Sequence, residues 1–129
     1  MHLISTGVSR NSKNILKSVT DNLDKVKPLL ETADKAYNAF MDEDYEYVIR
    51  LMKESWVQKK STTKAIVENK VIQDMDKLLE ENERVLSHRL VGAGNGGYFL
   101  TFSHKNSLKI PFNCVKVDIE PNGVTGRII

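Results

Sequence analysis

The 129-residue sequence lacks several features that would place it in a special class of protein. Its single cysteine, Cys114, excludes an internal disulfide and is typical of a reducing compartment. No apolar run approaches the roughly 20 residues that a transmembrane helix needs, and the N-terminus shows no basic segment followed by an apolar export signal. These absences predict a cytoplasmic protein that does not associate with a membrane.

The chain also lacks an excess of charge of either sign. With 19 basic and 17 acidic residues the net charge is +2, which is too small to predict nucleic acid as a partner. The three histidines, His2, His88 and His104, do not have the spacing of metal ligands. The order of residues supports no catalytic triad either. We expect one globular domain over residues 1–129, with no metal site.

What the sequence does contain is a series of segments with regular apolar spacing. Residues 2–8 are typical of a short strand that ends at Gly7. Apolar residues then recur at helical spacing over residues 15–26, 28–41, 45–56 and 71–79, and Asn69 is a suitable N-cap for the last helix. Such stripes usually pack into a core. The clearest stripe consists of Leu29, Leu30, Ala33, Ala36, Tyr37, Phe40 and Met41.

Polar residues 59–64, Lys-Lys-Ser-Thr-Thr-Lys, predict a break between the third and fourth helices. Such a cluster can bind phosphates, but a solvated face is the simpler interpretation. Towards the C-terminus, residues 115–119 alternate as in a strand, and Asn-Gly at residues 122–123 predicts a hairpin with residues 124–129. The predicted order is one strand, four helices and then about four strands, which indicates an α+β sandwich.

A glycine-rich stretch lies between two strand-like segments. Gly92, Gly94, Gly96 and Gly97 fall within six residues, and successive bare N–H groups can form a concave cradle for a phosphate. The spacing fits Gly-x-Gly-x-x-Gly, but a dinucleotide site needs a helix directly after the glycines. Here a strand-like segment, residues 98–102, follows instead, and no Lys-Ser or Lys-Thr completes a P-loop.

Three segments of this sequence resemble the GHMP family of sugar and metabolite kinases. Leu90-Val-Gly-Ala-Gly-Asn-Gly-Gly-Tyr-Phe-Leu100 resembles the glycine motif of the family's C-terminal half. Ser5-Thr-Gly-Val-Ser-Arg-Asn-Ser-Lys-Asn-Ile-Leu16 resembles the Tyr-Thr-Gly-Ile-Ser-Arg segment of its heptose-phosphate kinase and fucokinase branch. Glu54-Ser-Trp-Val-Gln-Lys-Lys-Ser61 resembles that branch's Ala-Trp-x-x-Lys-Lys helix. The resemblance covers nearly the whole chain, but only the C-terminal half of such a kinase.

The resemblance implies more than the periodicity does. It implies a ferredoxin-like antiparallel sheet of about four strands with an enlarged layer of about four helices. It also implies a sugar or sugar phosphate as ligand. The residues expected to bind its phosphate or the substrate itself are Gly92, Ala93, Gly94, Asn95, Gly96, Gly97, Thr6, Gly7 and Arg10. Asn95 stands where the family normally has glycine, and asparagine tolerates left-handed backbone better than most residues.

The same resemblance implies what this chain does not supply. No segment is similar to the family's ATP loop, Pro-x-x-x-Gly-Leu-Gly-Ser-Ser-Ala, and no catalytic residue is expected. ATP and Mg²⁺ would join only with an N-terminal half, so no cofactor is expected on this chain alone. The predicted function is the acceptor-side domain of an ATP-dependent sugar kinase, paired with such a half or with a second copy.

Two alternative functions and two structural alternatives stay open at this point. The chain could be a non-catalytic binding module that keeps the fold, or, with less support, a nucleic-acid binder that uses its lysines. The glycines could form a tight turn between strands without a ligand, and Arg10 could be a solvated arginine at a helix start.

Overall fold

The computed structural model describes residues 1–9, 12–92, 94–104 and 108–119. Its sheet consists of β1 (His2–Ser5), β2 (Val85–Leu90), β3 (Tyr98–Ser103) and β4 (Cys114–Lys116), in the spatial order β2-β3-β1-β4. Every neighbouring pair is antiparallel. Ile4 of β1 lies opposite Phe99 of β3 and Cys114 of β4. The predicted α+β class with an antiparallel four-stranded sheet is confirmed.

Four α-helices lie between β1 and β2 in the sequence, as predicted. They are α1 (Ser12–Thr20), α2 (Lys27–Met41), α3 (Tyr45–Thr62) and α4 (Lys70–Glu81), with short 3₁₀ helices η1 (Leu23–Lys25) and η2 (Lys64–Val67). The single helix expected over residues 15–26 is wrong in its length, because α1 ends at Thr20 and Asp21-Asn22 separates it from η1. Asp and Asn favour such turns since their side chains compete for backbone groups.

The starts of α2 and α4 agree with the sequence predictions, whereas the end of α3 does not. Pro28 lies in the first turn of α2, where its missing N–H costs nothing. Asn69 caps α4 by accepting a hydrogen bond from the N–H of Val71. The predicted break over residues 59–64 is wrong in its position, because α3 continues through Lys59 and Lys60 to Thr62.

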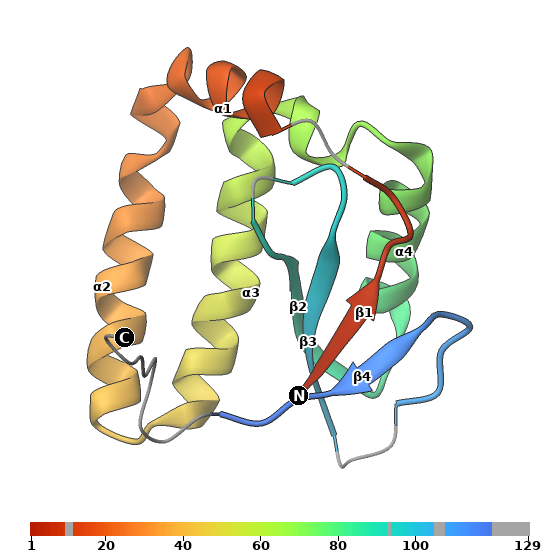
Figure 1. Ribbon diagram of the computed structural model, residues 1–129. Helices are drawn as coiled ribbons and strands as arrows, with labels where there is room; N and C mark the ends of the chain where they lie inside the picture. Colours follow the sequence, from red (N-terminus) through yellow and green to blue (C-terminus); the bar gives the residue numbers. More distant parts are fainter. Residues whose placement is uncertain (10–11, 93, 105–107, 120–129) are drawn as a thin grey trace, which may run out of the picture.

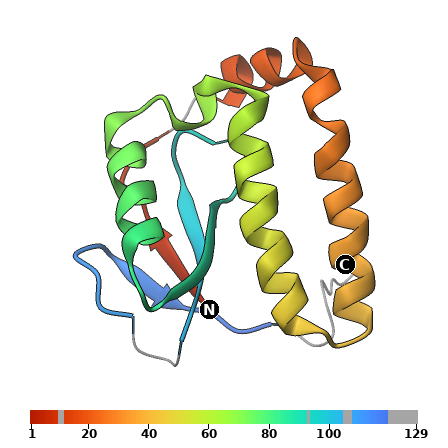
Figure 2. The ribbon, with the colours of Figure 1, turned by 180° about the vertical axis from the view of Figure 1, so that it is seen from behind.

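The helices cover the sheet unequally (Figures 1 and 2). The antiparallel pair α2 and α3 stands beside the β2 edge, whereas α4 lies across one face of the sheet. The core fills the space between that face, α4 and α3. Its buried members are Ile4, Ile15, Trp56, Ile66, Ile72, Met75, Leu79, Leu90 and Phe99. Trp56 meets Phe99 edge to face, with ring centroids 6.0 Å apart.

The apolar stripe of α2 is not part of this core, so the prediction of core packing is wrong for this helix. Tyr37 and Met41 are 66% and 64% exposed, and the buried residues of α2 are Thr32 and Ala39. The physical reason is that α2 packs mainly on α3 rather than on the sheet. A second layer of apolar surface is therefore left beside the core.

The predictions of a C-terminal hairpin and of no membrane-spanning helix remain to be compared with the structure. The predicted hairpin at residues 121–129 lies outside the described residues. Within the described ranges, every helix is too short or too polar to cross a bilayer.

Candidate functional site

The glycine loop (residues 92–97) joins β2 to β3 through left-handed backbone. Gly92, Gly94 and Gly97 have φ values of 81°, 110° and 90°, and Asn95 has a φ of 51°. A Cβ atom on Gly94 would lie 2.8 Å from Cγ2 of Ile66. Both the backbone conformation and the close packing on η2 therefore require glycine at position 94.

Part of the predicted phosphate cradle is used inside the protein. The N–H of Asn95 donates to the Ile66 carbonyl at 2.6 Å, and that of Gly97 donates to the Val8 carbonyl at 3.1 Å. The side chain of Asn95 accepts a hydrogen bond from the N–H of Asn69 at 2.8 Å. Asn95 thus ties the loop to the start of α4, and its side-chain amide is turned towards that helix.

Thr6 and Gly7, which the resemblance places at the site, lie directly beside the glycine loop. The buried Thr6 hydroxyl donates to the Gly97 carbonyl at 2.8 Å and accepts from the N–H of Val8 at 3.2 Å. Gly7 is exposed in a left-handed conformation, with φ of 67°. These two residues line a shallow hollow with residues 110–113, whereas Gly92 lines a different cavity. Arg10 and Ala93 lie outside the described residues.

Lys59 reaches the glycine loop from α3. Its ammonium donates to the carbonyl of Leu90 at 3.2 Å and to that of Gly92. The interpretation of residues 59–64 as a solvated face is therefore wrong for Lys59, which fixes the point where β2 becomes loop. The signal available in the sequence was its place in the Trp-x-x-Lys-Lys segment.

The next lysine belongs to a second polar cluster, centred on Asp76 of α4. Its carboxylate accepts hydrogen bonds from Trp56 Nε1 at 2.7 Å, from Lys60 Nζ at 2.9 Å and from His88 Nε2 at 2.6 Å. Burial opposes ionisation and by itself raises the pKa of Asp76, but the bonds from His88, Lys60 and Trp56 lower that pKa to about 2. The cluster joins α3, α4 and β2 through side chains that sequence order did not connect.

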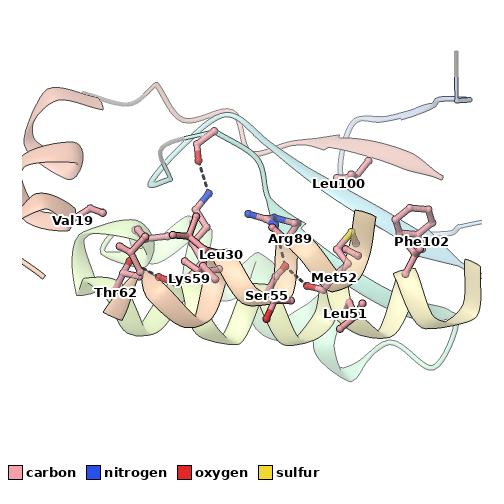
Figure 3. Close-up of a pocket in the computed structure, with 18 of the residues that line it drawn as sticks. Val19, Leu30, Leu51, Met52, Ser55, Lys59, Thr62, Arg89, Leu100 and Phe102 are labelled. Carbon is pink, nitrogen blue, oxygen red and sulfur yellow. Dashed lines mark hydrogen bonds between the residues drawn. The ribbon is translucent and has the colours of Figure 1, made fainter. Parts of the chain in front are cut away.

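The cavity that Gly92 touches is a chamber of about 750 Å³ between α1, α2, α3 and the strands β2 and β3 (Figure 3). Its apolar walls include Val19, Leu30, Leu51, Met52, Leu100 and Phe102. Arg89 of β2 enters it and donates from Nη1 to the Ser55 hydroxyl at 3.0 Å. Burial lowers the pKa of this guanidinium. Sequence reasoning did not find the chamber, because it predicted α2 as core.

Neither the glycine loop nor the Asp76 cluster resembles a magnesium site. Mg²⁺ is bound through carboxylate and phosphate oxygens. The loop instead presents backbone groups and Lys59. Within the described part of the chain, no three His, Cys, Asp or Glu side chains gather where they could hold a metal ion.

A search of solved structures finds a related fold despite low sequence similarity. No family model matches the chain, and no curated protein matches it either. The mevalonate kinase of L. major, solved in complex with R-mevalonate, matches with a TM-score of 0.58 and 15% sequence identity. The match covers 81% of this chain but 33% of the mevalonate kinase, so the chain spans about a third of that protein. Mevalonate kinase is a GHMP kinase, and the likeness shows a fold consistent with the C-terminal domain of that family.

Proposed function

We propose that this chain is the acceptor-side part of a GHMP-type kinase and works together with an ATP-binding half. The observation that carries the proposal is the left-handed glycine loop between β2 and β3, in a fold shared with mevalonate kinase. The loop is held by three residues outside it: Thr6, Lys59 and Asn69, whose N–H donates to the Asn95 side chain. Such fixation suits a loop that must present its backbone to a ligand without reorganising.

The ligand we propose is the phosphorylated acceptor, a sugar phosphate. The preference for heptose phosphate or fucose rests on two sequence segments alone, Thr6-Gly7 and the helix that carries Trp56. The structural neighbour, a mevalonate kinase, does not add to it. R-mevalonate, the ligand named for that protein, is therefore the second acceptor to test. Backbone N–H groups of the loop and the Arg10 guanidinium would contact the anionic group of either acceptor.

Phosphoryl transfer needs donors around a triphosphate, a metal ion and a group that orients the acceptor hydroxyl. In this proposal ATP and Mg²⁺ come with the partner half, where they would supply the phosphoryl group and neutralise its charge. This chain contributes the positioning of the acceptor. We expect no measurable phosphoryl transfer from ATP to any sugar by the purified chain alone, and robust turnover would contradict the proposed division of labour.

An NMR titration with a heptose phosphate, and in parallel with R-mevalonate, tests the site. We expect weak, salt-sensitive shifts around the glycine loop, and weaker binding after Arg10→Ala or Gly96→Val. Loss of charge-assisted hydrogen bonds to Arg10 is expected to cost about 1.5–3 kcal/mol of binding free energy. Lys77→Ala, an exposed cation further along α4, is the matched control. Shifts confined to residues 59–64, or unchanged affinity in both variants, would make the loop a structural turn.

A non-catalytic binding module is the second candidate, because the chain spans about a third of the mevalonate kinase and part of the loop's donors are used internally. The N–H groups of Asn95 and Gly97 and the Thr6 hydroxyl are already bonded within the protein. The coding sequence next to this chain separates the two candidates. An adjacent frame with the Gly-Leu-Gly-Ser-Ser-Ala loop supports the kinase, and titratable ligand binding without such a frame supports the module.

A further inference from the structure

The chamber beside the core combines mostly apolar walls with a half-buried cation, Arg89. Its volume of about 750 Å³ falls in the range of small-molecule sites. Among the described residues that line it, none is acidic, whereas Arg89 and Lys59 are both cationic. Lys59 is directed to the carbonyls at the end of β2. Arg89 extends into the space between α3 and the strands, as Figure 3 shows.

The guanidinium of Arg89 has more donors than its protein surroundings use. It carries five N–H groups, and its one hydrogen bond among the described residues goes to the Ser55 hydroxyl. That hydroxyl is oriented by its own bond to the Met52 carbonyl at 2.8 Å. A cation between apolar walls is costly unless an anion pairs with it. The half-buried guanidinium therefore has N–H donors left over for an anion in the chamber.

The other polar groups of the chamber offer little to a polar ligand. The Thr32 hydroxyl bonds to Pro28 and Gln58, and the Thr62 hydroxyl bonds to the Lys59 carbonyl. A sugar or nucleotide would exchange its water hydrogen bonds for contacts with leucine and valine, which is unfavourable. An alkyl chain would lose nothing by the same transfer and would gain from burial.

We propose that the chamber binds a small amphiphile with one anionic head group, a carboxylate or phosphate monoester, paired with Arg89, and an apolar tail lying against α2. Leu29, Leu30, Ala33 and Ala36 form the wall for the tail. The proposal explains why the first half of the α2 stripe, Leu29 to Ala36, is apolar although it does not enter the core. It does not depend on the proposed kinase function, because its anion is paired with Arg89 rather than with the N–H groups of the glycine loop; Gly92 and Lys59 border both sites.

Binding can be measured on the purified chain by calorimetry and by methyl NMR, with probes that separate head from tail. Decanoate and decyl phosphate carry both parts, decanol carries the tail alone, and acetate carries the head alone. The three probes with a decyl or decanoyl chain are used below their critical micelle concentrations. We expect decanoate or decyl phosphate to bind at least tenfold more tightly than decanol, and acetate not to bind. The ratio of the two anions tells which head group the site prefers. Shifts should appear at Leu30, Leu51 and Leu100, and not at Leu78 on α4.

Two substitutions make the test specific. Arg89→Met removes the positive charge but keeps an unbranched apolar side chain. We therefore expect the anionic probes to bind about tenfold or more weakly, while the affinity for decanol is unaffected. Arg84→Met, on the exposed residue just before β2, is the matched control and should change nothing. Ala33→Phe fills the chamber from α2 and should abolish binding of both kinds of probe. Because Ala33 is exposed, this variant is expected to fold.

Three outcomes would overturn the proposal. The first is equal affinity of the wild-type chain and Arg89→Met for decanoate. The second is a set of methyl shifts outside the chamber. The third is a chain that is dimeric through this face and binds none of the probes.

Discussion

At the scale of single residues, Trp56 connects the core to the polar cluster around Asp76. Its ring is 2% exposed and packs against Phe99, and its N–H is bonded to the Asp76 carboxylate. We predict that Trp56→Ala lowers the free energy of unfolding by about 3–5 kcal/mol, the usual cost of a large cavity. Val57→Ala, at the neighbouring exposed position, is the control. Denaturant melts measure both, and a loss below about 1 kcal/mol for Trp56→Ala would contradict its structural role.

Asp76 gives stability a defined dependence on pH. The pKa of its carboxyl is about 2 in the folded chain, below its usual value of 3.8, so the unfolded chain binds a proton more readily. Its contribution is therefore fully present above about pH 5 and is lost as the pH falls towards 2, with a total of about 2 kcal/mol. Comparing wild type with Asp76→Asn in urea melts from pH 6 to pH 2 measures this loss.

The matched control for Asp76 is Asp74→Asn on the same helix. Asp74 pairs with Lys70 on the exposed surface, and such pairs contribute about 0–1 kcal/mol. We expect the stability difference between wild type and Asp76→Asn to shrink as the medium is acidified, while that for Asp74→Asn stays small throughout. A difference for Asp76→Asn that does not change with pH would exclude the linkage.

At the scale of elements, the glycine loop offers a comparison between two left-handed glycines. Gly94→Ala places a methyl group 2.8 Å from Ile66 and also requires an unfavourable φ. Gly7→Ala requires the unfavourable φ alone, since no atom lies within 4 Å of the added Cβ. We predict a loss of about 1–2 kcal/mol for Gly7→Ala and a clearly larger loss for Gly94→Ala. Equal losses in thermal melts would show that the contact with η2 relaxes easily.

The elements also show how far sequence reasoning reaches. Alternation and helical spacing predicted the strands that the structure describes and the four α-helices, because both depend on local periodicity. They could not distinguish the stripe of α4, which meets the sheet, from that of α2, which meets mainly α3. The glycines of the loop were recognisable from their spacing. The attachment of Lys59 to Gly92, and that of Asn95 to Asn69, depend on tertiary contacts between segments about 30 residues apart.

At the scale of the whole molecule, apolar side chains at the turn between α2 and α3 are exposed. Tyr37, Phe40, Met41 and Tyr45 gather there, outside the chamber, and Phe40 meets Tyr45 edge to face. Large apolar patches are uncommon on monomers. We predict a homodimer through this patch, seen as a rise in mass with concentration in light scattering. Met41→Glu should return the chain to a monomer, whereas Val71→Glu on α4 should not. A wild-type chain that is monomeric at all concentrations would contradict the prediction.

The hydrogen bond from the Asn69 N–H to the Asn95 side chain has a consequence for motion. The residue that caps α4 is itself held by the glycine loop, so the loop and the first turn of α4 form one cooperative unit. Amide protons in both segments should therefore exchange with solvent in the same opening events. A ligand that changes the loop conformation should therefore also shift the first turn of α4, and through that helix Asp76, which lies about two turns beyond the Asn69 cap.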